Sequence, residues 1–195
     1  RRINYLSSIG KVIEFFLSNK NDSISVELNK AVREAEKHNC WFSESNILNA
    51  LGYWKNKLKK NVLNAWINEY NFNNQNSKVA IIMAGNFPLA GFHDLISVII
   101  SGNNAIIKPS SDDKILIEFF VSYLHKEFPE TDKLVKIIYN KLTDFDKVIA
   151  TGSNNTFKYF EYYFREKKSL LRKNRTSLAV LSGNETNDEL RLLSD

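Results

Sequence analysis

The sequence is poor in cysteine and in long apolar runs, and each absence excludes a class of protein. Its 195 residues contain one cysteine, Cys40, so an internal disulfide is impossible and a reducing cytoplasm is the expected compartment. No apolar run approaches the ~20 residues needed to cross a bilayer, and no signal-peptide pattern is present at the start. The chain begins at Arg1 rather than Met and breaks off inside a helical pattern at Asp195, so we expect a piece of a longer protein.

The charge does not single out nucleic acid as a partner. There are 27 Lys and Arg residues against 22 Asp and Glu residues, and acidic residues are interspersed among the lysines. Only residues 167–175, KKSLLRKNR, form a basic cluster. A nucleic-acid-binding protein usually shows a basic stripe with interleaved aromatic residues or a reader motif. Neither is present, and the apolar fraction of 43% is ordinary for a soluble globular protein.

The first ~75 residues read as helix throughout, because their apolar residues recur at helical spacing. Ser43 followed by the acidic Glu44 predicts the start of one of these helices. Residues 71–78, NFNNQNSK, end the helical pattern, and we expect the main boundary of the chain there. The sequence therefore predicts a helical N-terminal region over residues 1–76.

Residues 77–195 alternate between strand and helix patterns, which is typical of a parallel α/β sheet. The continuous apolar run at 79–83 predicts a strand that is covered on both faces. Gly102 is well placed to end the helix that follows. The expected strands cover residues 79–83, 105–107, 135–139, 147–150 and 177–181, and the expected helices cover 92–101, 112–128, 156–167 and 185–193.

Two common phosphate-binding motifs are missing from this α/β half. It contains no GxGxxG fingerprint, and no Gly-Lys-Ser/Thr of a P-loop occurs. A parallel sheet still predicts a nucleotide-sized ligand outside the carboxyl ends of its strands. If a dinucleotide binds there, it must use a different set of loops.

Three segments match a different loop set in order and spacing. They are GNFPL at 85–89, SGNNAIIKPS at 101–110 and VIATGSN at 148–154. Together they resemble the cofactor-binding domain of the aldehyde dehydrogenase superfamily. The stretches CWFSESNI, GNFPLAGFHD, TGSNNTFKYFEYYF and RKNRTSLAVLSGNET are more similar to one branch, the fatty acyl-CoA reductases of bacterial luminescence. The resemblance runs from about Asn39 to the end of the chain.

The resemblance implies a truncated Rossmann-like NAD(P)-binding domain over residues 77–195 and a role for several residues. It makes the side-chain amide of Asn86 an oxyanion-hole donor to the thioester carbonyl of an acyl-CoA substrate. It assigns cofactor binding to Lys108, Pro109, Ser110, Ser111, Thr151, Gly152 and Ser153. Ser111 stands where NAD-specific relatives often have Glu, and a hydroxyl can donate to a 2′-phosphate. NADPH is therefore the expected cofactor, with NADH as the other possibility.

Each of these residues also has a purely structural reading. Asn86 could cap the following helix, and Lys108 could be an ordinary lysine at a strand end. Ser153 could be a simple N-cap, although a helix N-terminus can cap and hold a pyrophosphate at once. Cys40 lies in the helical region, so we expect a structural role for it. His93 and Asp94 are adjacent on a helix and point apart, which favours a structural role, with Asp94 as a helix cap.

Neither a metal site nor a hydrolytic base is predicted. The three histidines share no metal-ligand spacing with one another or with the cysteine. Ordinary aldehyde dehydrogenases place a general-base Glu about where residues 171–175, LRKNR, stand. A reductase needs no hydrolytic water, so the absence of this base fits acyl-CoA reduction.

Two hypotheses of function follow from the sequence. The first is a fragment of an NADPH-dependent acyl-CoA reductase, inactive alone, whose cysteine nucleophile lies outside this chain. The second is a non-catalytic module whose helical half docks a partner, since such reductases work with acyl-transferring enzymes. A homo-oligomer is also possible under either hypothesis.

Overall fold

Four helices form the first part of the chain, as their apolar periodicity predicts. The computed structural model describes residues 1–18, 22–71, 76–173 and 178–194. Its first helices are α1 (Arg2–Leu17), α2 (Ser23–His38), α3 (Glu44–Lys57) and α4 (Lys60–Asn68). The Ser43 hydroxyl accepts the backbone N–H of Asn46 at 3.3 Å. The expected start of α3 is thereby confirmed.

A five-stranded parallel sheet follows, and it confirms the predicted α/β class. Its strands are β1 (Lys78–Ile82), β2 (Asn104–Lys108), β3 (Val135–Ile137), β4 (Lys147–Thr151) and β5 (Lys168–Arg172). They lie in the order β3-β2-β1-β4-β5. The other helices are α5 (Phe92–Ile100), α6 (Lys114–Glu127), α7 (Asn154–Phe164) and α8 (Asn187–Ser194), with short 3-10 helices at Ser111–Asp113 and Pro129–Lys133.

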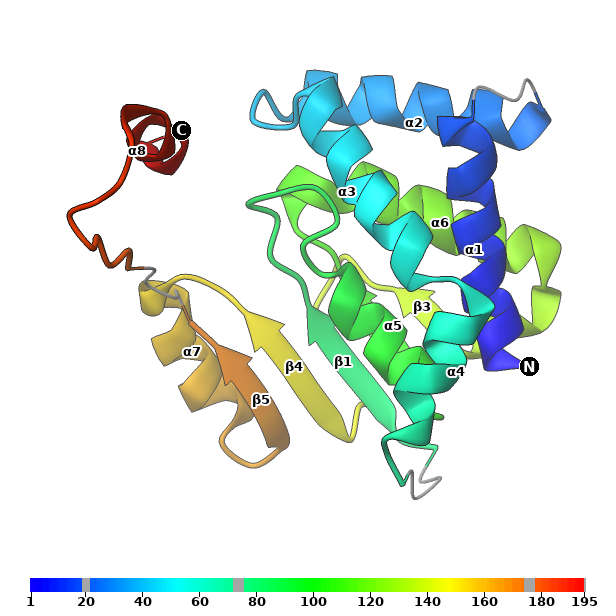
Figure 1. Ribbon diagram of the computed structural model, residues 1–195. Helices are drawn as coiled ribbons and strands as arrows, with labels where there is room; N and C mark the ends of the chain where they lie inside the picture. The colour runs from blue at the N-terminus through cyan, green and yellow to red at the C-terminus, as the bar shows by residue number, and fades with distance from the viewer. Residues whose placement is uncertain (19–21, 72–75, 174–177, 195) are drawn as a thin grey trace.

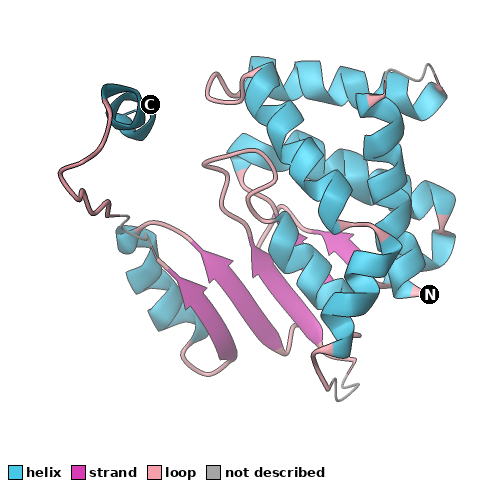
Figure 2. Ribbon diagram, viewed as in Figure 1, coloured by secondary structure: helices cyan, strands magenta, loops and turns pink. Residues whose placement is uncertain are grey.

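The strand order places helices on both faces of the sheet. The chain moves from β1 toward β3 in one direction and from β4 to β5 in the other, so right-handed crossovers require opposite faces. Figure 1 shows α5 over β1 on one face and α7 against β5 on the other. The helices of the N-terminal region pack beyond α5 and α6, and strands and helices form separate layers (Figure 2).

One hydrophobic core joins the N-terminal helices to the sheet. Phe42, Phe92 and Phe120 are fully buried in it. The ring of Phe92 lies 5.1 Å from that of Trp54 on α3 and 5.3 Å from that of Phe120 on α6, at centroid distances favourable for aromatic pairs. A smaller cluster of Ala80, Val148 and Ala150 packs against the aromatic side chains of α7 on the other face.

The end of α5 confirms the role expected of Gly102. This residue has φ of 92°, a left-handed conformation that glycine adopts without steric cost. Its N–H donates to the carbonyl of Ile99 at 3.2 Å, and Asn103 N–H donates to the carbonyl of Val98 at 3.2 Å. This pair of bonds is the Schellman motif, which stops the helix just before β2 begins.

The strand expected at 177–181 is wrong. Ser177 lies outside the described residues, and Leu178–Leu181 form no strand. The fifth strand is β5, which the sequence reading took as part of the basic cluster. β5 lies at the edge of the sheet, pairs only with β4 and is largely exposed. A strand that is not buried on both faces does not require a continuous apolar run. Leu178 and Val180 are instead 83% and 84% exposed, and α8 stands apart from the sheet (Figure 1).

Membrane-spanning structure is not found in the part of the chain that the structure describes. No helix there combines the length with the apolar character that a bilayer crossing requires.

The loop between β1 and α5 depends on the absence of a side chain at Gly91. A Cβ there would overlap the side chain of Met83, whose own Cβ would be 2.6 Å away. We expect Gly91→Ala to lower the free energy of unfolding by about 1–3 kcal/mol, the usual cost of overpacking. Urea denaturation measures the change.

Gly52→Ala is the matched control for that variant. Gly52 lies inside α3, and an added Cβ would have no atom within 4 Å. Ala is the better helix former by about 1 kcal/mol, so this change should stabilise the protein. Equal effects of the two substitutions would contradict the steric explanation.

Candidate functional site

The three sequence segments meet at one edge of the sheet. Ile82 at the end of β1 pairs with Lys108 of β2 on one side and Ala150 of β4 on the other. The loops that follow these strands therefore lie side by side at their carboxyl ends. The strand order switches between β1 and β4, because β2 and β3 are added on one side of β1 and β4 and β5 on the other. Open α/β sheets bind ligands at such a switch point.

Asn86 is exposed in the loop between β1 and α5. The helix begins six residues later with Gly91 as its N-cap, and no side chain caps it. Asn86 therefore does not cap α5, which removes the structural alternative for this residue. Leu89, in the turn that follows, has φ of 61°, a left-handed conformation that is rare for a bulky side chain.

A cleft of about 700 Å³ opens beside Asn86. One wall comes from α3, whose Asn46, Ala50, Tyr53 and Trp54 follow one another at helical spacing. The other walls are formed by Trp41, the Asn86–Ala90 loop and His93. The His93 ring lies 5.9 Å from that of Trp66 and 6.5 Å from that of Trp54, between centroids. The cleft is thus largely aromatic, with the Asn86 amide at its rim.

The sequence reading did not connect α3 with this cleft. On one face of this helix, polar Asn46 is mixed with Ala50, Tyr53 and Trp54. Such a mixed face is a local signal that α3 borders an open cleft.

Lys108 and the turn after β2 form the second part of the site. The Lys108 ammonium donates to the carbonyl of Asn140 at 3.1 Å, in the loop after β3. The Ser110 hydroxyl accepts the Asp112 N–H at 3.3 Å. The Ser111 hydroxyl donates to the Asp112 carboxylate at 3.1 Å. The Lys108 ammonium therefore still has N–H donors free for a ligand, whereas the Ser111 hydroxyl already donates its proton to Asp112.

The end of α2 holds this turn from outside, a contact that the sequence did not predict. His38 Nε2 lies 2.7 Å from the carbonyl oxygen of Ser111, so this nitrogen carries the proton. The side-chain amide of Asn39 reaches the carbonyl of Asp112 at 3.5 Å. Nothing in the local sequence links residues separated by 73 positions, so only the tertiary fold reveals the contact.

Thr151, Gly152 and Ser153 form the third part of the site. Thr151 ends β4, and the Gly152 N–H donates to the carbonyl of Arg172 at 3.1 Å. The Ser153 hydroxyl accepts the Thr156 N–H at 3.2 Å and so caps α7. The N-terminus of this helix, with its unpaired N–H groups and positive potential, faces the switch point.

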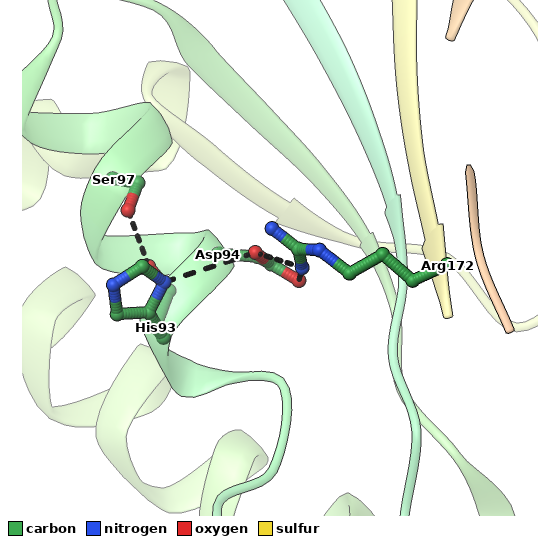
Figure 3. A network of polar contacts seen from close by, with 4 residues as sticks. All are labelled: His93, Asp94, Ser97 and Arg172. Carbon is green, nitrogen blue, oxygen red and sulfur yellow. Dashed lines mark hydrogen bonds and ion pairs between the residues drawn. The ribbon is translucent and has the colours of Figure 1, made fainter. Parts of the chain in front are cut away.

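An ion pair links the two halves of the sheet beside the site. Arg172 Nη1 donates to Asp94 Oδ1 at 2.6 Å and to Asp94 Oδ2 at 2.7 Å (Figure 3). The Asp94 side chain is only 7% exposed and that of Arg172 29% exposed. The Nδ1 of His93 lies 3.9 Å from Asp94, and the His93 carbonyl accepts the Ser97 hydroxyl at 2.8 Å. The expectation that Asp94 caps the helix is wrong, because its carboxylate oxygens accept from Arg172 and no side-chain cap bond is present at the start of α5.

Asp113 is a second buried carboxylate, and it forms no ion pair with any of the residues that the structure describes. It is 4% exposed, and neither carboxylate oxygen has a hydrogen-bond partner among the described residues. Burial raises its pKa to about 7, although the backbone N–H groups of Leu89 and Ala90 approach it and pull the pKa down.

Cys40 is the remaining reactive group. It is exposed in the turn between α2 and α3, and it is not among the residues that line the cleft. Within the described part of the chain, no group of three or more His, Cys, Asp or Glu residues is arranged to hold a metal ion.

Comparison with known proteins places this fold and these segments in context. A family model described as "Acyl-CoA reductase (LuxC)" matches residues 27–190. A search of curated protein sequences found no match.

Solved structures share the fold. Aldehyde dehydrogenase C of Pseudomonas syringae, solved as a mutant with NAD⁺ and octanal, aligns with a TM-score of 0.61 at 15% identity, over 90% of this chain and 39% of its own. Aldehyde dehydrogenase 21 of Physcomitrella patens aligns with a TM-score of 0.62 at 13% identity, over 91% of this chain and 40% of its own. An NADP-dependent enzyme of E. coli aligns with a TM-score of 0.60 at 11% identity, over 91% of this chain and 40% of its own. The chain thus spans about two-fifths of the length of these structures.

The ion pair should contribute to stability mainly through the cost of leaving Asp94 unpaired. We expect Arg172→Met to lower the free energy of unfolding by about 3–5 kcal/mol, as for other broken buried pairs. The double variant with Asp94→Leu and Arg172→Met should recover most of that loss, since no charge stays buried. Urea denaturation of the four proteins in this cycle measures the coupling.

The exposed pair of Lys78 and Asp144 supplies a control, because Asp144→Asn should change stability little. A double variant as unstable as Arg172→Met alone would contradict the buried-charge explanation.

Asp113 should make stability depend on pH. Its pKa rises from 3.8 to about 7 on folding, so the destabilisation of the native state grows as the pH rises from 3.8 to 7 and stays constant above 7. The cost vanishes below pH 3.8, where the carboxyl is protonated in both the folded and the unfolded state. Asp113→Asn should therefore stabilise the protein by about 1–4 kcal/mol at pH 8 and hardly at all at pH 4, by urea denaturation. Asp112→Asn, at the exposed neighbouring carboxylate, should show no such pH-dependent gain.

Proposed function

Because the chain belongs to the acyl-CoA reductase (LuxC) family, we propose that it forms the cofactor-binding part of an enzyme that reduces a fatty acyl-CoA to an aldehyde with NADPH. The reacting cysteine would come from outside these 195 residues, since Cys40 does not line the cleft. Residues 1–76 would supply a helical region and residues 77–195 the Rossmann-like domain. A cytoplasmic location suits the single exposed thiol.

The meeting of three loops at the switch point carries this proposal. The Asn86 loop, the turn after Lys108 and the start of α7 all follow strands whose carboxyl ends are adjacent. Such a crevice is where open α/β sheets bind dinucleotides. The family and the shared fold support a nicotinamide cofactor in this position.

The residues present fit such a cofactor. The capped N-terminus of α7 supplies N–H groups and positive potential for a pyrophosphate. Gly152 packs closely on this helix, since a Cβ there would lie 3.0 Å from the Phe160 ring and 3.1 Å from the Thr156 side chain. Lys108, with Pro109 fixing the chain behind it, would hold the ribose. When bound, the cofactor supplies the hydride.

The aromatic cleft beside Asn86 suits a fatty acyl chain. Its walls of Trp41, Tyr53, Trp54 and Phe87 are apolar surfaces, and Asn86 also lines it. An acyl chain in the cleft would place its thioester carbonyl near the Asn86 amide. Such a preorganised donor stabilises the developing oxyanion by about 3–4 kcal/mol.

Arg172 supports reduction rather than hydrolysis. It ends β5 beside the site, and both oxygens of Asp94 accept from its guanidinium. A guanidinium is always protonated and cannot accept a proton from water. Its partner Asp94 is buried and already paired, so neither residue of this pair serves as a general base.

The turn after β2 bears on the choice between NADPH and NADH. Ser111 could donate to a 2′-phosphate, but its hydroxyl now donates to Asp112. A 2′-phosphate would have to redirect that hydroxyl and would lie near the Asp112 carboxylate. We propose NADPH as the cofactor, with Lys108 supplying the attraction and Asp112 limiting the affinity.

Fluorescence titration of this chain with NADPH and NADH tests the proposal. We expect saturable binding with higher affinity for NADPH. Lys108→Met should weaken NADPH binding about tenfold or more, since it removes a charge-assisted contact. Asp112→Asn should raise the affinity for NADPH several-fold and leave that for NADH nearly unchanged.

Lys136→Met serves as the control, because it removes an exposed lysine from the neighbouring strand β3. The absence of saturable binding of either nucleotide to the folded chain would overturn the cofactor proposal. Equal effects of the two lysine variants would remove Lys108 from the site.

A further inference from the structure

A second cavity adjoins the aromatic cleft beside Asn86. It measures about 400 Å³ and lies between α3, α4 and α5. The side chains that line both this cavity and the cleft are Tyr53, Trp54 and His93. We call the second space the distal cavity, because it lies across these three side chains from the cleft. An elongated ligand that fills the cleft can therefore reach the distal cavity by passing them.

The walls of the distal cavity are mainly apolar. One wall comes from α4, whose lining residues recur at helical spacing and are Val62, Leu63, Ala65, Trp66 and Glu69. Leu58 and, on α5, Ile96 add further aliphatic surface. Lys57 and Glu69 also line the cavity, but both are exposed, so their charged ends stay in water. The volume is that of a small-molecule site, and the lining suits an alkyl group.

The side chains between the two cavities differ in how firmly they are held. Trp54 is 7% exposed, and its ring packs edge-on against that of Phe92 in the core, at a centroid distance of 5.1 Å. Tyr53 is 53% exposed, and the side chain of His93 is 61% exposed. Exposed side chains change rotamer within nanoseconds, whereas a core ring is held by close packing. Trp54 thus forms a fixed floor, while Tyr53 and His93 can turn aside for a chain that crosses it.

Aromatic surface continues from the cleft into the distal cavity. Trp41 lines the cleft, Trp54 lines both cavities and Trp66 lines the distal cavity. The ring of His93 lies 6.5 Å from that of Trp54 and 5.9 Å from that of Trp66, between centroids. A flexible alkyl chain suits such a path, because it buries apolar surface and needs no hydrogen-bond partner.

We propose that the distal cavity binds the far end of the acyl chain of an acyl-CoA substrate, and that the α4 residues lining it set the longest chain that the site accepts. The inference rests on the proposed acyl-CoA reduction and on the placing of the acyl chain in the cleft. The thioester end stays near Asn86, and the methylenes beyond Trp54 enter the distal cavity. A short acyl chain fills the cleft alone and leaves the distal cavity to water.

Chain length should therefore govern affinity over a longer range than the cleft alone allows. Burial of one more methylene raises affinity about three- to fourfold. The gain continues as long as added methylenes find wall atoms, and it stops where the chain leaves the distal cavity. Ala65 has the smallest side chain in the α4 wall and is exposed, so a larger side chain there narrows the cavity without disturbing the core.

Tryptophan fluorescence of this chain, titrated with octanoyl-, decanoyl-, dodecanoyl- and tetradecanoyl-CoA in the absence of nucleotide, tests the inference. The three tryptophans of the sequence all line the two cavities, so the signal reports on this path. We expect affinity to rise about tenfold for every two methylenes added along the series. Ala65→Phe should leave the affinity for octanoyl-CoA unchanged and lower that for tetradecanoyl-CoA about tenfold or more.

Asn61→Phe is the matched control, because Asn61 is an exposed residue of the same helix that does not line the distal cavity. This variant should bind every member of the series as the wild-type chain does. Val62→Phe narrows the same wall from a neighbouring position, so it should repeat the length-dependent loss of Ala65→Phe.

A wild-type affinity that stops rising at octanoyl-CoA would overturn the inference. It would also be overturned by an equal loss at every chain length in Ala65→Phe, or by equal effects of Ala65→Phe and Asn61→Phe. In each of these cases octanoyl-CoA still binds, and the proposed acyl site beside Asn86 stands. If no acyl-CoA binds to the folded chain, that acyl site and the inference both fail, while the nucleotide titration still decides the cofactor site.

Discussion

The parallel pairing of β1 with both of its neighbours is the constraint on which the site depends. Ile82 stands level with Lys108 and Ala150, so three loops leave the sheet at one place. The pairing is fixed by burial on both faces, because Ala80 and Ile81 are completely buried against opposite layers. A slip of one residue would exchange these faces and separate the loops. The position of every proposed cofactor contact follows from this register.

Buried charge is concentrated around the element that carries Asn86. Asp94 and Asp113 are both buried, one on α5 and one on the turn after β2. Arg172 neutralises the first, whereas neither carboxylate oxygen of the second has a hydrogen-bond partner among the described residues. A buried carboxylate without a cation is costly, and proteins keep such groups mainly where a function depends on them.

The sequence predicted those parts of the structure that depend on local order. The strands β1, β2, β3 and β4 carry apolar runs that the sequence makes visible. The three site segments directly follow β1, β2 and β4, so the meeting of their loops could be inferred. The edge strand β5 carries a weak pattern and was missed, while the apolar residues 178–181 were wrongly taken for a strand.

The missed parts of the site are all non-local. The Arg172–Asp94 pair joins residues 78 positions apart, and the contact of His38 with Ser111 spans 73. The isolation of Asp113 is a property of its surroundings and leaves no trace in its neighbours along the chain. Periodicity identifies elements, but it cannot say which charges will be buried or with what they will pair.

The helical region takes part in the site more than a boundary at residue 76 suggests. It supplies one wall of the aromatic cleft through α3 and holds the turn after β2 through His38 and Asn39. Its apolar faces are buried in the core shared with α5 and α6. A module that docks a partner through its helices would need an apolar helical face that the sheet layer does not use. Much of the apolar surface of these helices is used in the shared core and in the wall of the cleft, which supports the proposed enzyme over an attached docking module.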